Sequence, residues 1–457
     1  MKQYSELPVE LRLHVASYLS SIDLASLALV SKSHIPIARE KLYQAPEIGP
    51  RDEGHRVLCF LRTMFARPEL IHEVRSLSIS FLRGTVPTRP SNSTEDAETL
   101  VQRSPYTQMA ELDASQYRAT RNELMERLCK LIDYPENRER TAFLRLKYWL
   151  TSAFYGGLIV VLPNLEELSL RSYAAPNLGD TWPMSYYSKN YFSLVTEGKA
   201  AREICRRMKL KRINCLAGPF EHYTDVQPCL ESLHVDADAC FRIGDIYPSA
   251  EQPTLTNLDL GFHMDKIIEA HNQRRIAQLW ELRPMLPGLQ RIKLMIVDMH
   301  TLKLPYRSSD FFDTVFDALD PCAHTLETLE ILPSASIHDR TFPNDVFCAM
   351  LSLSRFTRLS KLVIPFRQGF DDLDAILQPT LRELTLLHPG PVQACDLQHI
   401  VNHCIAHRNL RRFDLYCALG DDVVLEDGAW SAFKEHGISV YVWAIVGNRL
   451  LKGMTAA

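Results

Sequence analysis

The chain has 457 residues, of which 46% are hydrophobic and 23% are charged, with a formal net charge of -4. This composition is typical of a folded protein with two or three ordinary domains or one elongated repeat architecture, and it excludes a disordered chain. Because 51 basic residues nearly balance 55 acidic ones, the sequence predicts no global attraction to nucleic acid or to an anionic membrane.

The cysteines and the apolar runs indicate the compartment. The 11 cysteines are scattered without a C-x-x-C pair, and most lie inside apolar runs, as buried free thiols do. Uninterrupted apolar runs, such as residues 158–162, are far shorter than the roughly 20 residues that a membrane span needs. No apolar signal region precedes Leu7. We therefore expect a soluble protein of a reducing compartment, cytoplasmic or nuclear.

The first 43 residues predict three short helices. Pro8 suits a first helical turn, and apolar residues follow it at helical spacing. A second apolar run covers residues 22–30 with Asp23 in its first turn, and a third helix is expected over residues 36–43. Three helices in roughly 40 residues bury too little surface to be stable alone. This segment is expected to complete its core against a partner.

The same segment resembles an F-box. It follows the F-box pattern in order: L-P-x-E, spaced aliphatics, D-L, L-x-x-V-S/C-K and a closing A-x-x-x-L-W/Y. It departs from that pattern after Lys32, where Ser33 and His34 stand near the usual aromatic residue. Members of the family use these helices to dock on the Skp adaptor of a Skp-cullin-F-box ubiquitin ligase. The resemblance implies adaptor contacts by Leu7, Pro8, Glu10, Leu11, Val15, Leu24, Leu27, Val30 and Leu42.

The region after the F-box, residues 47–164, predicts an irregular helical part that includes the first repeat. Helical patterns cover residues 55–66, 123–134 and 140–155. Residues 84–106 are rich in Pro, Ser, Thr and charge and almost lack large apolar residues, which predicts a mobile insertion. Residues 172–189 predict a second irregular loop, whose aromatic residues are expected to pack on the fold or to serve a partner.

An apolar segment of the form L-x-x-[LIF]-x-[LIVC] recurs along residues 165–457. Amphipathic helical stretches at 266–283, 309–320, 344–356 and 394–407 separate several copies, so the unit is a strand followed by a returning helix that must stack on its neighbours. The nine copies begin at Leu165, Leu210, Leu230, Leu255, Leu289, Leu326, Leu359, Leu381 and Leu410, with a looser copy at Val74 and a closing apolar strand at residues 438–446.

This pattern resembles degenerate leucine-rich repeats, and the combination resembles F-box proteins with leucine-rich repeats, particularly the fungal type. The expected fold is α/β: an N-terminal three-helix F-box over residues 1–46, followed by an irregular leucine-rich-repeat solenoid, or horseshoe. The main competitor is a (β/α)8 barrel. Barrel strands are buried on both faces and read as continuous aliphatic runs, whereas these strands carry polar residues between the leucines.

Side chains alternate along a strand, so the polar positions between the buried leucines share the opposite, concave face. Arg and Tyr usually dominate protein interfaces, so Arg291, Arg412 and Tyr416 are the strongest candidates to bind a target. The full set of expected target contacts is Glu167, Arg171, Arg212, His234, Asp236, Asn257, Asp259, Arg291, Lys293, Glu330, Glu383, Arg412, Asp414 and Tyr416.

Common catalytic motifs are absent from the sequence. The sequence contains no P-loop, no G-x-G-x-x-G, no G-x-S-x-G and no H-E-x-x-H. His399, His403 and His407 follow one helix at a spacing of four, but no suitably spaced acidic or Cys partner completes a metal site. The basic run at residues 206–212 is expected to be a solvated surface. We predict neither metal nor cofactor.

Taken with the F-box resemblance, the sequence predicts a non-catalytic adaptor that holds the Skp adaptor, and through it a cullin, and presents a target protein for ubiquitination. Two alternatives stay open. One is a scaffold that uses the F-box and the repeats outside a ligase, and the weaker one is an enzyme built on a barrel. Partners other than proteins, namely nucleic acid and membrane, are not expected.

Overall fold

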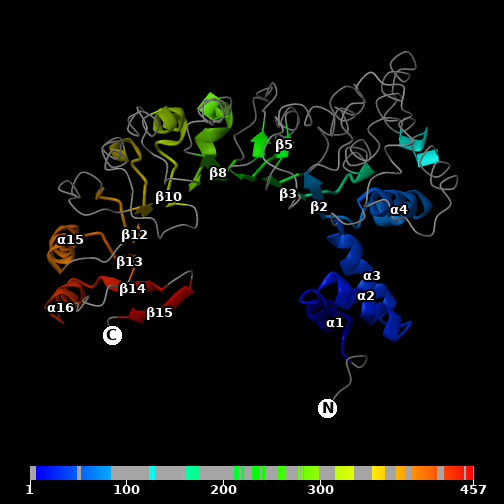
Figure 1. Ribbon diagram of the computed structural model, residues 1–457, viewed down its shortest axis with the longest axis horizontal. Coiled ribbons are helices and arrows are strands. Elements are labelled where there is room, and N and C mark those ends of the chain that lie inside the picture. The colour runs from blue at the N-terminus through cyan, green and yellow to red at the C-terminus, as the bar shows by residue number, and fades with distance from the viewer. Residues whose placement is uncertain are drawn as a thin grey trace. The chain divides into compact units, whose positions relative to one another are not determined.

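In the computed structural model the chain forms two compact units, an N-terminal unit (Met1–Leu230 and Ala239–Asp245) and a C-terminal unit (Glu231–Asp238 and Ile246–Ala457). Each unit is described by itself (Figure 1). The structure describes residues 7–48, 53–83, 123–124, 126–128, 158, 161–174, 210–215, 218–220, 229–236, 239–241, 255–263, 276–277, 279–280, 282–297, 314–333, 353–365, 377–387, 394–418, 427–446 and 449–455.

Three helices open the N-terminal unit: α1 (Val9–Ala16), α2 (Ser21–Val30) and α3 (Ile35–Gln44). The Ser20 hydroxyl caps α2 by accepting a hydrogen bond from the Asp23 backbone N–H at 3.2 Å. The helices share a small core of Ala16, Leu24 and Ile37, against which Leu13, Leu19 and Leu42 pack. The expected three-helix segment therefore forms.

The third helix leads almost directly into a sheet. Only Ala45 and Pro46 separate α3 from β1 (Glu47–Ile48), which pairs in parallel with β2 (Ser76–Arg83). The backbone N–H of Arg75 donates to the Gln44 carbonyl at 2.9 Å, and the rings of Tyr43 and Phe60 stack at 6.3 Å between α3 and α4 (Glu53–Ala66). The short helix α5 (Pro68–Ile71) follows. The three helices and the first strands are thus joined by backbone and ring contacts.

The strands of the N-terminal unit lie in chain order. The parallel order is β1, β2, β3 (Glu167–Ala174) and β4 (Arg212–Cys215). The strands β5 (Gly218–Phe220) and β7 (Ala239–Phe241) form a separate parallel pair. Residues 172–174, expected in a loop, extend β3 instead, because they continue its pairing with β2.

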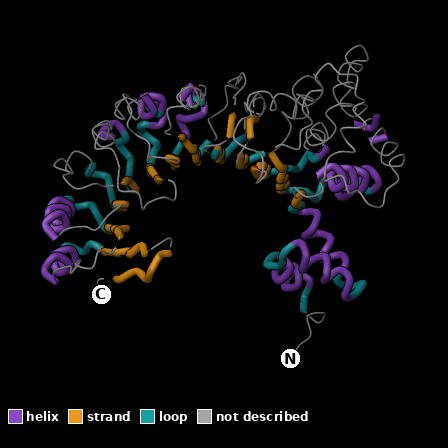
Figure 2. Tube along the Cα trace, viewed as in Figure 1, coloured by secondary structure: helices purple, strands orange, loops and turns teal. Residues whose placement is uncertain are grey.

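The C-terminal unit repeats this arrangement at greater length, with helical segments on one side of a row of strands (Figures 1 and 2). Each strand pairs in parallel with the next in the chain until β15, which is antiparallel to β14. The strands are β6 (Ser232–Val235), β8 (Asn257–His263), β9 (Arg291–Val297), β10 (Thr328–Pro333), β11 (Lys361–Pro365), β12 (Glu383–Leu387), β13 (Arg412–Ala418), β14 (Ser439–Val446) and β15 (Arg449–Thr455).

The connections of this unit include helices α15 (Ala394–Ala406) and α16 (Asp427–Glu435) and the 3-10 segments η6 (Arg283–Gly288) and η8 (Asp320–Cys322). Because the strand order is linear and ends in an antiparallel strand, this unit differs from a (β/α)8 barrel, whose strands are all parallel and close on themselves.

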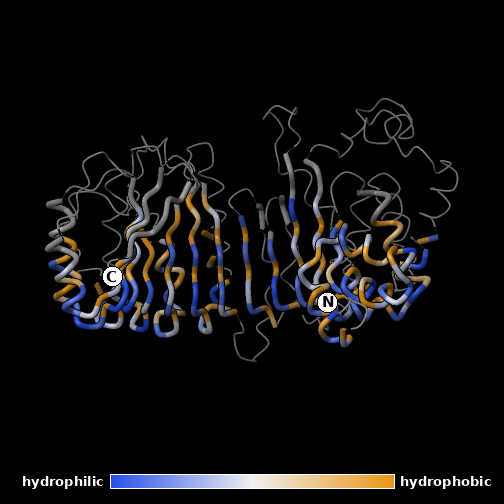
Figure 3. The backbone as a smooth tube through the Cα atoms, turned by 90° about the horizontal axis from the view of Figure 1, so that it is seen from below, coloured by the Kyte–Doolittle hydropathy of each residue, from blue (hydrophilic) through white to orange (hydrophobic). Residues whose placement is uncertain are grey.

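Every copy of the apolar segment found in the sequence coincides with a strand or the residues just before it. The first residue of each copy is buried, and so are the fourth and sixth positions wherever the structure describes their side chains. Hydrophobic and hydrophilic residues alternate along the strands (Figure 3). In the C-terminal unit the fourth positions form one paired row: Leu233, Leu258, Ile292, Leu329, Leu362, Leu384, Phe413 and Val440.

A backbone motif recurs from strand to strand. The N–H groups of Gln290 and Arg291 both donate to the Thr256 carbonyl at 2.9 Å, just where β9 begins. A shared carbonyl of this kind fixes the register of each strand relative to its neighbour, and it pairs two backbone N–H groups that would otherwise lack an acceptor. The same arrangement occurs at the carbonyls of Arg75, Glu166, Glu231, Gln290, Glu327, Ser360 and Arg382.

Some sequence expectations fall outside the described residues. These are the mobile insertion at residues 84–106, the helix at residues 140–155 and most of the loop at residues 172–189. The division into an F-box, an irregular region and a solenoid that begins at residue 165 stays a prediction, as does the identification of the repeats as leucine-rich.

Two buried cysteines provide a test of the core. Burial raises the pKa of the Cys322 thiol to about 12 and also raises the pKa of Cys404. Both should therefore stay protonated at pH 8 and react with iodoacetamide at least tenfold more slowly than the half-buried Cys59 and Cys229. Mass spectrometry of the alkylated peptides measures each rate. Equal labelling of all four in the native chain would contradict this packing.

Candidate docking surfaces

The three N-terminal helices expose apolar side chains that an isolated domain would bury. Among the expected adaptor contacts, Leu11, Val15 and Val30 are exposed, as are Pro8 and Glu10. Three further expected contacts, Leu7, Leu27 and Leu42, are half-buried. Leu24 is buried in the shared core of the helices, so it supports the surface from beneath.

Four more apolar residues of this helical segment are exposed and were not predicted as contacts: Val9, Tyr18, Leu29 and Ile35. Leu29 and Val30 at the end of α2 are the most prominent apolar neighbours, with 88% and 75% of their surface exposed. Helical geometry could have predicted the exposure of Leu29, because this residue lies about 140° around the helix from the buried Leu24. Exposed apolar residues gathered on one element mark an interaction site.

The second candidate surface is the face of the C-terminal strands opposite the core. Strand register arranges its side chains in rows that cross the strands. The first row is Ser232, Asn257, Arg291, Thr328, Lys361, Glu383, Arg412 and Ser439. The second row is His234, Asp259, Lys293, Glu330, Val363, Thr385, Asp414 and Tyr441.

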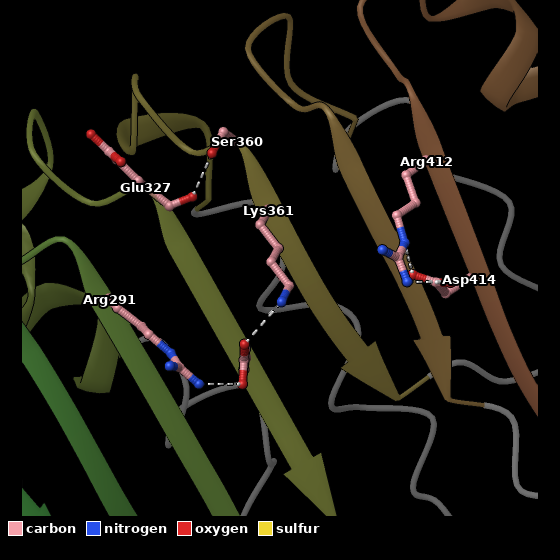
Figure 4. Close-up of polar contacts among 7 residues, drawn as sticks. Arg291, Glu327, Ser360, Lys361, Arg412 and Asp414 are labelled. Carbon is pink, nitrogen blue, oxygen red and sulfur yellow. Dashed lines mark hydrogen bonds and ion pairs between the residues drawn. The ribbon is translucent and has the colours of Figure 1, made fainter. Parts of the chain in front are cut away.

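One carboxylate bridges two cations on this face. Glu330 on β10 accepts a hydrogen bond from Arg291 Nη2 on β9 at 3.3 Å, and Lys361 Nζ on β11 lies 3.3 Å from its other oxygen. Arg291 and Lys361 point toward each other across the strand between them (Figure 4). Glu330 is buried, so it holds the two cations rather than reaching outward.

A similar arrangement holds Arg412. Its Nε and Nη2 donate to the two oxygens of Asp414 at 2.7 and 3.2 Å (Figure 4), and its guanidinium carbon lies 4.7 Å from the ring centroid of Tyr441. Hydrogen bonding to Asp414 raises the pKa of Arg412 above its ordinary value. Partial burial raises the pKa of Tyr416, which follows Asp414 by two residues on β13.

The other expected target contacts are divided between the units. In the C-terminal unit, His234 Nδ1 lies 3.3 Å from Asp259 Oδ2, and the half-buried Asp236 follows β6. In the N-terminal unit, Glu167 and Arg212 pair across β3 and β4, and Arg171 is exposed further along β3. The expected set therefore forms one surface on each unit.

Residues 4–45 match the family model named F-box-like. The chain carries an F-box-like domain. No curated protein matches the chain.

The F-box-like domain coincides with the three helices and their exposed apolar residues. F-box domains typically bind Skp-type adaptors and through them cullins, and proteins that carry them are generally non-catalytic adaptors. The domain places this chain in a ubiquitin-ligase and protein-interaction context. Its match includes His34, which is buried where the sequence departs from the usual aromatic pattern.

Within the described part of the chain, no group of three or more His, Cys, Asp or Glu residues is arranged to hold a metal ion. His403 and Cys404 lie on α15, where Cys404 is fully buried and His403 is half-buried, so these neighbours face different surroundings. Of the basic run, residues 210–212 are described, and Arg212 is exposed there. Among the helices of the described segments, none is both long and apolar enough to cross a membrane.

The bridging carboxylate can be tested by Glu330→Gln, which keeps the volume and removes the charge. We expect a loss of about 1–2 kcal/mol in unfolding free energy, because two cations lose a shared partner although both are partly solvated. Glu327→Gln is the matched control: its partner Arg358 lies 3.3 Å away and both are largely exposed, so less than about 0.5 kcal/mol is expected. Equal losses in chemical denaturation would mean that Glu330 has no special role.

Proposed function

We propose that the chain is a substrate-recognition subunit of a Skp-cullin-F-box ubiquitin ligase. The F-box-like domain binds the Skp-type adaptor, and the strand repeats, which we interpret as degenerate leucine-rich repeats of the fungal F-box type forming a solenoid, bind a target protein. The observation that carries the proposal is the set of exposed apolar residues on an F-box-like domain, above all Leu29 and Val30. This function places the chain in the cytoplasm or the nucleus.

Two further observations support the proposal. The first is the repeated strand with its shared backbone carbonyl, which supplies an extended sheet whose face opposite the core presents ordered charged side chains. The second is the short step from α3 to β1, which joins the adaptor-binding helices to the first strands of the repeats. The mechanism is proximity: the chain holds a target near a cullin-bound ubiquitin-conjugating enzyme and itself makes and breaks no bonds.

Co-purification tests the proposal. The tagged full chain, co-expressed with a Skp-type adaptor and a cullin, should retain both, and a chain lacking residues 1–46 should retain neither. A Leu7→Ala and Pro8→Ala double variant should bind less adaptor. Retention of the adaptor without the cullin would instead assign the chain to a scaffold outside the ligase, and undiminished capture by the truncated chain would exclude the F-box-like domain as the docking element.

A further inference from the structure

The charges on the strand face of the C-terminal unit are unequally accessible. The cationic side chains of Arg291, Lys361 and Arg412 are 47%, 37% and 45% exposed, whereas the carboxylates of Glu330 and Asp414 are 11% and 8% exposed. A ligand that approaches this face therefore meets cations first. Glu383, which stands between Lys361 and Arg412 in the first row, is half-buried and interacts electrostatically with Arg412.

The cations are also held in place before any ligand arrives. Glu330 fixes Arg291 and Lys361, while Asp414 and the ring of Tyr441 fix Arg412. Ordering a long side chain on binding costs conformational entropy, so side chains that are already ordered bind a partner more tightly. The buried carboxylates thus act as positioning residues for an outward-facing row of cations.

The three cations stand on alternate strands. They belong to the first row, on β9, β11 and β13. Neighbouring strands lie about 4.8 Å apart, so the backbones of these residues are roughly 9.6 Å apart. Their charged ends are not evenly spaced, because Arg291 and Lys361 lean toward the same Glu330 carboxylate while Arg412 turns along its own strand to Asp414. They therefore form one pair of cations and one separate cation, which several acidic side chains of one extended segment can meet.

An apolar row runs beside the cations. The side chains that continue the same strands on the same face are Met295, Leu332, Pro365, Leu387 and Tyr416, and Pro365 is buried while the others are half-buried. Because Arg291, Lys361 and Arg412 reach toward the second row, their charged ends come within about two residues, roughly 6.6 Å, of this apolar row. One extended segment can contact both rows.

We propose that this face binds an extended protein segment that carries several Asp or Glu residues and apolar side chains between them. The inference rests on the proposed function and names the class of target for its second surface. The apolar row favours a peptide over a nucleic acid, whose backbone offers phosphates but no aliphatic groups.

The test selects binders from a display library of random twelve-residue peptides on the full chain. Enriched peptides should contain several Asp or Glu residues with apolar residues between. A synthetic copy of an enriched peptide should bind at least tenfold more weakly to the Arg291→Gln, Lys361→Gln, Arg412→Gln variant, and its own Glu→Gln copy should bind the parent chain more weakly. Fluorescence anisotropy measures each affinity.

The matched control replaces three exposed cations outside the rows, as Arg382→Gln, Arg408→Gln and Lys434→Gln, and should change affinity less than twofold. The proposal is overturned if enriched peptides are basic or uncharged, if both triple variants behave alike, or if a twelve-nucleotide RNA binds the row more tightly than the peptides. Adaptor capture by the full chain is measured separately. If the full chain does not capture the adaptor, the proposed function is refuted. If it captures the adaptor but does not select acidic peptides, only this inference is refuted.

Discussion

Replacing Leu29 and Val30 by Gln is expected to reduce capture of a Skp-type adaptor at least tenfold while leaving the fold intact. Both side chains are largely exposed in the free chain, and Gln has a helix propensity at least as good as that of Val, so α2 should persist. Burying one such side chain contributes about 1.5–3 kcal/mol, and about 1.4 kcal/mol corresponds to a tenfold change in affinity. Surface plasmon resonance with immobilised adaptor measures the change.

Two controls make this result interpretable. Trp280→Gln removes an exposed apolar side chain from the C-terminal unit and should leave adaptor affinity unchanged. Leu24→Gln changes a buried residue of the same helix, so it should reduce both adaptor capture and thermal stability. If the Leu29 and Val30 double variant binds the adaptor like the parent chain, the docking surface lies on another side of the helices.

The largest expected loss of stability in the C-terminal unit follows Phe413→Ala. Phe413 on β13 is 1% exposed and stacks on Phe433 of α16 with ring centroids 5.4 Å apart, so it links the penultimate helix-bearing repeat to the last. Truncating a buried Phe typically costs about 3–5 kcal/mol. We expect hydrogen exchange to accelerate first in residues 394–446, because repeats depend on their nearest neighbours.

Arg411→Ala, on the exposed residue just before β13, is the matched control and should shift the thermal midpoint little. A double-mutant cycle with Phe433→Ala separates the ring pair from the general loss of packing. The assignment of this pair to the core would be wrong if Phe413→Ala cost no more than the control.

The buried rows of the sheet could be predicted because their signal is local. A Leu at the first, fourth and sixth position of a short segment reports the alternation of a strand, and the segments at Leu289, Leu326 and Leu359 all lead into strands. The same alternation assigned Arg291, Glu330 and Arg412 to the opposite face, where the strand register places them.

The burial of Glu330 could not be predicted, because it depends on residues far away in the sequence. Its partners Arg291 and Lys361 come from the strands on either side, and no local pattern states which side chains will meet across three strands. The exposure of Leu29 was also missed, because the F-box pattern names the apolar positions without separating those that face the helical core from those that face outward.

The two-residue step between α3 and β1 has a mechanical consequence. Pro46 restricts the backbone there, its carbonyl accepts a hydrogen bond from the Ser78 N–H at 3.1 Å, and Gln44 is tied to Arg75 from the other side. This connection is too short and too restrained to act as a flexible linker, so a rotation of the helices would also move the first strands. Within the proposed ligase, a target lysine held near these first strands would keep a set distance and direction from the adaptor instead of moving with a flexible linker.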